Sequence, residues 1–312
     1  MSDKQKLVIL TGPTAVGKSK LSIELAKRIG GEIISADSMQ VYKYMNIGTD
    51  KISTEKMCGV PHHLIDFLEP TEDFNVFMFQ KLVKEKIAEI SARGNVPILV
   101  GGTGFYIQAV LYDIDFTETD EDDGYRTELE QRAVKEGAHV LHEELRQVDP
   151  VSADIIHENN VKRVIRALEY FKKTGRPISE HNEEQHQNVS PYDFRYFVLT
   201  DERKTLYSRI DKRVDQIIEE GLEQEVRDLE KLNIPKTATS MQSLGYREMI
   251  GYLEGEYDLE RAIYLIKLNT RHFAKRQLTW FRRERDVIWI DKNDYDHDDE
   301  QILKEMIRIY EQ

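Results

Sequence analysis

Two patterns of apolar residues alternate along this 312-residue chain. Short apolar runs of strand length predict strands at 7–10, 32–37, 97–100, 194–199 and 287–291. Between these runs, apolar residues that recur every three or four positions predict helices at 21–29, 77–90, 206–229 and 261–285. Strands that alternate with helices indicate an α/β fold, with a parallel sheet as its core and helices on its faces. The run at 287–291 is interpreted as an edge strand.

The middle of the chain departs from this alternation. A cluster of acids begins at Asp113, and helical spacing then resumes at 129–145 and 161–171. The polar residues 181–190 lack periodicity and are interpreted as a linker that leads back to the sheet. We therefore expect two parts, an inserted all-helical lobe at 116–190 and a core that comprises 1–115 and 191–312.

The junction of the first strand and the first helix carries a phosphate-binding motif. Residues 12–19, Gly-Pro-Thr-Ala-Val-Gly-Lys-Ser, match the P-loop pattern G-x-x-x-x-G-K-S/T at every fixed position. Glycines let the backbone N–H groups of such a loop approach one anion at the positive end of the helix dipole. Lys18 adds a positive charge, and the Ser19 hydroxyl is placed to hold a divalent cation. The residues expected to bind the phosphates are Gly12, Thr14, Ala15, Val16, Gly17, Lys18 and Ser19.

Two further strands of the predicted sheet end near residues with useful chemistry. Asp37 closes the strand at 32–37, and ligands gather at the carboxyl ends of parallel strands, so Asp37 is expected near the phosphates. Its position alone fits both a metal-binding or structural carboxylate and a general base. The strand at 97–100 runs into Gly101-Gly102-Thr103, where nucleotide-hydrolysing P-loop proteins usually carry an Asp for magnesium. This difference favours a bound diphosphate over ATP hydrolysis, with Thr103 facing another of its oxygens.

The cysteine and histidine positions exclude several kinds of site. Cys58 is the only cysteine, which excludes internal disulfides and cysteine-based zinc sites. His62 and His63 have no third ligand at a regular spacing, so we interpret them as a packed pair. No apolar run reaches the length of a membrane span, and the first strand begins too early for a leader peptide. We expect a cytoplasmic monomer with no membrane partner.

The formal net charge of −13 argues against a nucleic-acid partner only if the charge is evenly spread. It is segregated, because residues 261–285 contain eight basic residues and only one acid, Glu284. On a helix, one face carries a basic stripe made of Lys267, Arg271, Lys275 and Arg282. A basic stripe with aromatic residues beside it suits a nucleic-acid backbone and stacked bases. The alternative is a helix whose basic side pairs with acids elsewhere in the protein.

Six segments together resemble the signature set of the bacterial tRNA dimethylallyltransferases. They are residues 12–19, Asp37–Gln40, Gly101–Gly104, Arg163–Glu169, Leu244–Arg247 and Lys275–Arg282. The resemblance covers nearly the whole chain in order, and the last segment resembles the tRNA-modifying branch and not the adenylate-modifying branch. It implies transfer of a dimethylallyl group from dimethylallyl diphosphate to N6 of the adenosine immediately 3′ of the anticodon, in tRNAs that read codons beginning with U.

The resemblance also implies roles for residues at matching positions. Asp37 resembles the general base that accepts a proton from the adenine N6. Thr103 would hydrogen-bond the oxygen that bridges the allyl carbon and the diphosphate. Lys18 and Arg213 would neutralise the departing diphosphate, and Ser19 would bind Mg²⁺.

The same resemblance implies a surface that binds the anticodon stem-loop of tRNA. Its residues are Asp37, Ser38, Met39, Gln40, Lys162, Arg163, Arg166, Gly245, Tyr246, Arg247, Lys275, Arg276, Gln277, Thr279, Trp280 and Arg282. Arg126 resembles a further basic catalytic residue, although the acidic residues 120–123 before it depart from the proline-rich sequence typical of the family.

Three other functions are compatible with parts of the sequence. A small-molecule P-loop kinase would consume ATP without any allylic diphosphate. A non-catalytic RNA-binding protein would use its P-loop only as a nucleotide sensor and would not need Asp37. An isopentenyltransferase of free nucleotides would accept AMP in competition with tRNA.

Overall fold

The computed structural model of the protein describes residues 4–116 and 124–312. The chain forms two compact units. The larger unit comprises Met1–Leu111 and Pro191–Gln312, and the smaller unit comprises Tyr112–Ser190. The acidic residues 120–123, expected at the start of the inserted lobe, lie outside the described residues.

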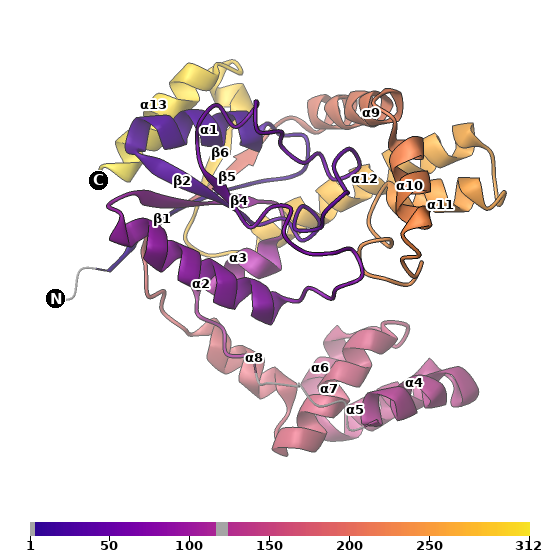
Figure 1. The fold of residues 1–312 in the computed structure, drawn as a ribbon. Helices are drawn as coiled ribbons and strands as arrows, with labels where there is room; N and C mark the ends of the chain where they lie inside the picture. The colour runs from indigo at the N-terminus through magenta and orange to yellow at the C-terminus, as the bar shows by residue number, and fades with distance from the viewer. Residues whose placement is uncertain (1–3, 117–123) are drawn as a thin grey trace. The chain divides into compact units, whose positions relative to one another are not determined.

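The core of the larger unit is a parallel sheet. Within the described residues it has six strands in the order β3-β2-β4-β1-β5-β6 (Figure 1). The strands are β1 (Lys6–Thr11), β2 (Gly31–Ser35), β3 (His62–His63), β4 (Val96–Gly101), β5 (Asp193–Thr200) and β6 (Val287–Asp291). In the centre of the sheet, Ile9 of β1 pairs with Leu99 of β4 and with Tyr196 of β5. The predicted α/β fold is confirmed, and β6 is an edge strand as predicted.

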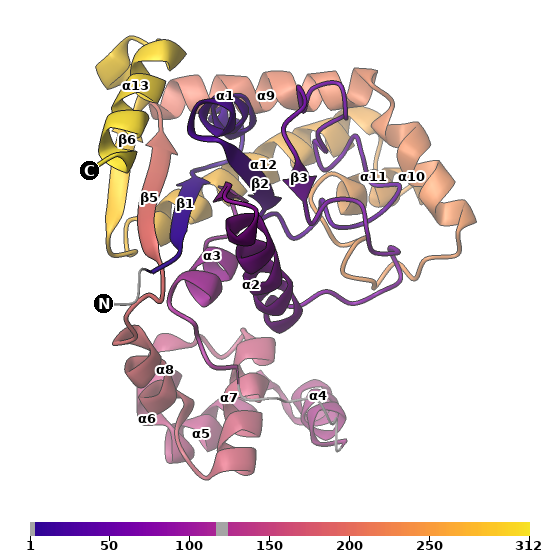
Figure 2. The ribbon, with the colours of Figure 1, turned by 60° about the vertical axis from the view of Figure 1, so that its left-hand side comes forward.

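Helices of the larger unit cover both faces of the sheet. They are α1 (Lys18–Ile29), α2 (Val76–Ala92), α3 (Gly104–Leu111), α9 (Arg203–Glu219), α10 (Leu222–Lys231), α11 (Tyr246–Leu253), α12 (Leu259–Phe281) and α13 (Asp299–Tyr310), with the 3₁₀ helix η1 (Lys292–Tyr295) before α13. Helices α1 and α13 lie side by side on one face, and α2 and α3 lie on the other (Figure 2). None of the helices in the described ranges is both long enough and apolar enough to cross a membrane.

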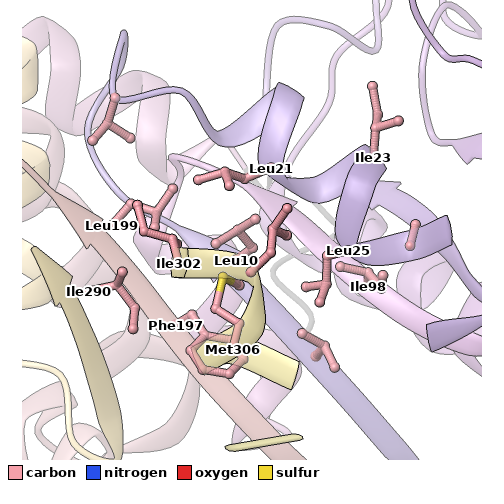
Figure 3. Packing of buried hydrophobic residues seen from close by; sticks show 14 of the residues in the cluster. Leu10, Leu21, Ile23, Leu25, Ile98, Phe197, Leu199, Ile290, Ile302 and Met306 are labelled. Carbon is pink, nitrogen blue, oxygen red and sulfur yellow. The ribbon is translucent and has the colours of Figure 1, made fainter. Parts of the chain in front are cut away.

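An apolar cluster anchors the phosphate-loop helix to the sheet (Figure 3). Leu21 and Leu25 of α1 pack with Ile302 and Met306 of α13 over Leu10 of β1, and all five side chains are buried. The spacing of four residues places each pair on one face of its helix. The predicted P-loop therefore joins a strand and a helix that are both fixed in the core.

Two helices of the larger unit differ from their predicted bounds. The helix expected at 206–229 is divided into α9 and α10 by Gly221, which has a φ of 104°. A residue in this left-handed conformation cannot continue a right-handed helix. The helix expected at 261–285 begins at Leu259 and ends at Phe281, so Arg283 and Arg285 lie beyond it.

The regular elements described in the smaller unit are helices. They are α4 (Tyr125–Glu136), α5 (Ala138–Val148), α6 (Pro150–Ile155), α7 (Val161–Thr174) and α8 (Ile178–His186). Their apolar core includes Leu129, Leu141, Leu145, Val164 and Leu168. The single helix expected at 129–145 is interrupted at Gly137. The interpretation of 181–190 as a linker is wrong for its first part, because α8 continues to His186.

The start of α8 is held by a buried carboxylate that lies far from it in the chain. Asp149 caps α6 by accepting the N–H of Ser152 at 3.0 Å, and it also accepts the N–H and the hydroxyl of Ser179 in the first turn of α8. The start of α8 is thus held by a residue thirty positions away. Such a contact leaves no periodic signal in the sequence of the helix itself.

Candidate active site

The phosphate loop has the geometry that its sequence predicts. β1 ends at Thr11, α1 begins at Lys18, and Gly17 before it has a φ of 98°. Gly12 is needed for close packing, because a Cβ atom there would lie 2.4 Å from the carbonyl oxygen of Leu199. The first turn of α1 contains no acidic residue. Its backbone N–H groups therefore form an electropositive helix start that suits a phosphate.

Lys18 lies folded over the loop. Its Nζ donates hydrogen bonds to the carbonyl oxygens of Gly12 (3.0 Å) and Pro13 (2.9 Å). Desolvation lowers the pKa of Lys18 to about 8, against the opposing effect of the carboxylates of Asp37 and Asp50. The ammonium group thus carries an incompletely stabilised charge, which a bound phosphate would stabilise.

Asp37 follows β2, and its carboxylate interacts electrostatically with the ammonium group of Lys18. Its Oδ1 accepts the N–H of Met39 at 2.8 Å and, more weakly, the N–H of Gln40 at 3.4 Å. Desolvation raises the pKa of Asp37, and these hydrogen bonds together with the charge of Lys18 offset only part of the increase. A fixed carboxylate of increased basicity beside an anion site is suited to accept a proton.

The turn after β4 brings Thr103 to the same edge of the sheet. Gly101 packs so closely that a Cβ atom there would lie 2.1 Å from the carbonyl oxygen of Ala36. The N–H of Thr103 points to that same oxygen at 3.4 Å. Thr103 therefore stands beside the residue that precedes Asp37, as expected from the carboxyl ends of neighbouring strands.

Gln277 of α12 joins the two glycine turns. Its Oε1 accepts the N–H of Thr14 at 2.9 Å, and its Nε2 donates to the carbonyl oxygen of Gly102 at 3.0 Å. The side chain is buried, with 7% of its surface exposed. Both ends of its amide thus hold the phosphate site in this structure, and the expected contact of Gln277 with tRNA stays a prediction. The sequence gives no sign of these two hydrogen bonds, which span more than 170 positions.

Arg213 of α9 pairs with two acids, Asp50 and Glu220, the second at 3.2 Å. Its Nη2 lies 2.6 Å from the carboxylate of Asp50, and Asp50 in turn interacts with Lys18. The buried Nε of Arg213 has no hydrogen-bond partner among the described residues. Arg209, four residues earlier on α9, pairs with the buried carboxylate of Asp201 at 2.6 Å.

The histidine pair is structural, as predicted. The Nε2 of His63 lies 2.7 Å from Glu32, and the Nδ1 of His62 lies 2.8 Å from the carbonyl oxygen of Val60. In the described part of the chain, no group of three or more His, Cys, Asp or Glu side chains could hold a metal ion.

The predicted basic stripe is divided between two roles. Lys267 pairs with Asp215 at 2.6 Å and Arg271 pairs with Asp211 at 2.8 Å, and both acids belong to α9. For these two residues the alternative interpretation, pairing with acids elsewhere, is correct. Within the expected tRNA-binding segment Lys275–Arg282, the exposed residues are Lys275, Arg276, Thr279 and Arg282.

The other expected tRNA contacts differ in their exposure. Tyr246 has no exposed surface, and its hydroxyl donates to Glu225, so its expected contact with tRNA has no exposed side chain in this structure and stays a prediction. Gly245 is also buried, whereas Arg247 is exposed. Gln40 donates from Nε2 to the carbonyl oxygens of Thr49 and Asp50, so its amide already holds a neighbouring loop. Trp280 packs edge-to-face on Phe105, at the start of α3.

The remaining predicted residues form a basic cluster within the smaller unit. Arg126 of α4 makes a two-point contact with Glu169 of α7, at 3.0 and 2.9 Å. Burial lowers the pKa of Arg166, with a further contribution from the charges of Arg126 and Arg163. Lys162 and Arg163 are exposed on the first turn of α7. The role of Arg126 in catalysis stays a prediction.

Comparison with known proteins agrees with the geometry of the phosphate site. The family model described as IPP transferase matches residues 40–284, and one described as isopentenyl transferase matches residues 5–73. The chain belongs to the IPP transferase family. A tRNA dimethylallyltransferase of Lachnoclostridium phytofermentans is 61% identical to it over 305 residues, which is 98% of this chain and 97% of that protein.

Solved structures agree with this membership. The full-length tRNA isopentenylpyrophosphate transferase of Bacillus halodurans is 47% identical, with a TM-score of 0.74 and coverage of 99% of this IPP transferase and 97% of that chain. A eukaryotic dimethylallyltransferase acting on tRNA is 31% identical, with a TM-score of 0.80 and coverage of 92% of this chain and 74% of that chain. The family predicted from the sequence is confirmed, and the protein is a transferase.

Proposed function

We propose that this protein transfers a dimethylallyl group from dimethylallyl diphosphate to N6 of the adenosine immediately 3′ of the anticodon, in tRNAs that read codons beginning with U. The names of its relatives support the transferred group and the tRNA acceptor. The observation that carries the proposal is the proximity of a fixed, basic Asp37 carboxylate to the lysine of a phosphate loop.

The reaction is a substitution at the allyl carbon. The N6 lone pair forms the new C–N bond, the C–O bond to the diphosphate breaks, and its electron pair leaves with the diphosphate. The N6 proton passes to Asp37. Because the N6 lone pair is delocalised into the purine ring, this amine needs an aligned base.

The leaving diphosphate accumulates negative charge, and the phosphate loop is proposed to stabilise it. The backbone N–H groups at the start of α1, Lys18 and Arg213 would supply fixed positive charge. The Thr103 hydroxyl would donate to the bridging oxygen and so favour its departure.

Mg²⁺ fits the oxygen chemistry of this site. In such sites Mg²⁺ is held largely by phosphate oxygens and water, with one or two protein oxygens. The hydroxyl of Ser19, an exposed residue in the first turn of α1, provides one. Bound Mg²⁺ would neutralise part of the charge of the diphosphate. Since the phosphate oxygens would supply most of its ligands, such a site does not require the cluster of acidic side chains that the described residues lack.

The acceptor adenosine must leave its base stack to reach the allyl carbon. The exposed residues Lys275, Arg276 and Arg282 beyond the phosphate site, and Lys162 and Arg163 of the smaller unit, are proposed to hold the RNA backbone.

The decisive experiment is incubation of the protein with dimethylallyl diphosphate, Mg²⁺ and unmodified tRNA, followed by mass analysis of the nucleosides. We expect dimethylallyladenosine at a single position. Turnover of ATP without an allylic diphosphate would support a kinase instead, and competition by AMP would support an enzyme of free nucleotides.

The base assignment needs a variant that keeps the loop intact. Asp37→Asn retains an oxygen that can accept the Met39 N–H, but it cannot take a proton. We expect turnover to fall by about 10²- to 10⁴-fold while tRNA affinity changes little. Equal losses of turnover and tRNA affinity would refute the role of Asp37 as base.

A further inference from the structure

A single carboxylate holds the loop that follows the Asp37 segment. Glu225 of α10 accepts hydrogen bonds from the consecutive N–H groups of Asn46 (2.8 Å), Ile47 (2.9 Å) and Gly48 (3.1 Å). It also accepts the hydroxyl of Tyr246 at 2.6 Å. Three adjacent backbone N–H groups and one phenol hydroxyl thus surround a single carboxylate. They form an anion-binding site, and the anion that occupies it is the side chain of Glu225.

Tyr246 holds the same loop together with Glu225. Its side chain has no exposed surface, and it lies in the first turn of α11. Burial and the adjacent Glu225 raise the pKa of Tyr246 well above its ordinary value, so the phenol stays a hydrogen-bond donor. Its ring packs directly on Gly48, where a Cβ atom would lie 2.4 Å from a ring carbon. Only glycine permits this contact.

The held loop is connected to Asp37 by hydrogen bonds. Gln40 donates from Nε2 to the carbonyl oxygens of Thr49 (3.2 Å) and Asp50 (3.3 Å), directly after the residues that Glu225 holds. The backbone N–H of Gln40 points to Oδ1 of Asp37. The N–H groups of Met39 and, more weakly, of Gln40 orient the Asp37 carboxylate, and the position of Gln40 depends on the loop that Glu225 and Tyr246 fix.

The geometry points to Glu225 and Tyr246 as positioning residues for the proposed base: together they hold the 46–50 loop so that Gln40 keeps Asp37 oriented toward the acceptor amine. This assignment rests on the proposed function of Asp37. It also explains why a tyrosine in a segment expected to face tRNA points inward. Arg247, the exposed neighbour of Tyr246, belongs to the same helical turn. This turn would therefore link a residue predicted to contact tRNA to the proposed general base, Asp37.

The test removes one hydroxyl. Tyr246→Phe keeps the ring against Gly48 and deletes the hydroxyl, with its hydrogen bond to Glu225 and its contacts with the backbone N–H groups of Gly48 and Thr49. We expect the single-turnover rate at saturating substrates to fall about tenfold, as the loss of one buried hydrogen bond to a charged group allows. The affinity for an unreactive diphosphate analogue, which reports on Lys18 and Arg213, is expected to stay within twofold.

A matched control contacts the same helix. Tyr257 follows α11, and its hydroxyl donates to the carbonyl oxygen of Glu248 in α11 at 2.9 Å. Tyr257→Phe removes this tyrosine hydroxyl from its contact with α11 without touching Glu225 or the 46–50 loop, and we expect its single-turnover rate to be unchanged. A similar loss in both variants would show that α11 is sensitive to any disturbance and would overturn the assignment.

The dependence on Asp37 is tested by combining variants. If Tyr246 acts through the base, Tyr246→Phe in the Asp37→Asn background causes less than a twofold further loss, measured as product formed over hours. An equal tenfold loss in both backgrounds, or no loss in the unmodified background, would overturn the assignment. Glu225→Gln, assayed in the same way, decides the question if Tyr246→Phe folds poorly. A normal rate for Asp37→Asn alone would instead refute the proposed role of Asp37 as the base, while absence of transfer by the unmodified protein would refute the proposed function.

Discussion

The Arg213 guanidinium lies 2.6 Å from the carboxylate of Asp50, a residue that also interacts with Lys18. The two cations proposed to receive the diphosphate thus share a negatively charged neighbour before the substrate binds. The diphosphate must compete for Arg213 with Asp50 and also with Glu220, which lies 3.2 Å from the guanidinium.

Neutralising Asp50 should therefore strengthen diphosphate binding. For Asp50→Asn we expect an unreactive analogue of dimethylallyl diphosphate to bind about threefold to fivefold more tightly, a size typical of an ion pair whose acid is largely exposed. Titration calorimetry would measure it. Asp215→Asn makes the same charge change on α9 without touching Arg213 and should have little effect. Weaker binding by Asp50→Asn would mean that Asp50 holds Arg213 in place for the substrate.

Diphosphate affinity should decrease as the pH rises through about 8. The pKa of Lys18 is lowered to about 8, so the ammonium form that attracts the anion is present below this pH and is lost above it. Binding of an anion stabilises the charged form, so the affinity is greatest on the acidic side. Calorimetric titrations between pH 7 and 9.5 would follow the decrease. Lys18→Met should bind weakly at all these values, and a decrease that persists in this variant would assign the titration to another group.

Removing the Gln277 amide should damage the phosphate site and not the RNA surface. Gln277→Leu leaves the Thr14 N–H and the Gly102 carbonyl without their partner, and we expect about tenfold weaker diphosphate binding with unchanged tRNA binding. Gln242→Leu, at an exposed glutamine, serves as the control. A selective loss of tRNA binding by Gln277→Leu would contradict the positioning role and support the role expected from the sequence.

The two pairs of residues in the basic stripe should respond differently to charge reversal. Charge reversal at Lys275 and Arg282 is expected to weaken tRNA binding and to reduce the salt dependence by about one ion per residue. Reversal at Lys267 and Arg271 breaks the ion pairs with α9, so it should lower thermal stability and leave the salt dependence nearly unchanged. Filter binding at several salt concentrations, combined with melting curves, would separate the two pairs. Identical salt slopes for both double variants would contradict this division.

The parts of the site that were predictable from the sequence are local. The phosphate loop is defined by its own eight residues between a strand and a helix, and Asp37 and Thr103 follow strands whose carboxyl ends must meet at one edge of a parallel sheet. Short-range patterns of this kind specify position without any knowledge of distant contacts.

The internal contacts that were not predicted from the sequence join residues far apart in the chain. Lys267 and Arg271 have the spacing of an RNA-binding face, but the choice between RNA and α9 depends on how two helices pack. Tyr246 and Gln277 lie in segments expected to face tRNA, yet they point inward to Glu225 and to the glycine turns. A polar side chain in a motif can contact the substrate, or it can hold in place the loop that binds the substrate. Only the tertiary structure distinguishes these two roles.

The packing of α13 against α1 has a consequence for synthesis on the ribosome. Leu21 and Leu25 of α1 are translated well before Ile302 and Met306 of α13, which pack on them. Until α13 has been synthesised, these two leucines lack part of their apolar cover, and the helix that follows the phosphate loop lacks that support. A nascent chain is therefore expected to complete its anion cradle only after α13 has emerged.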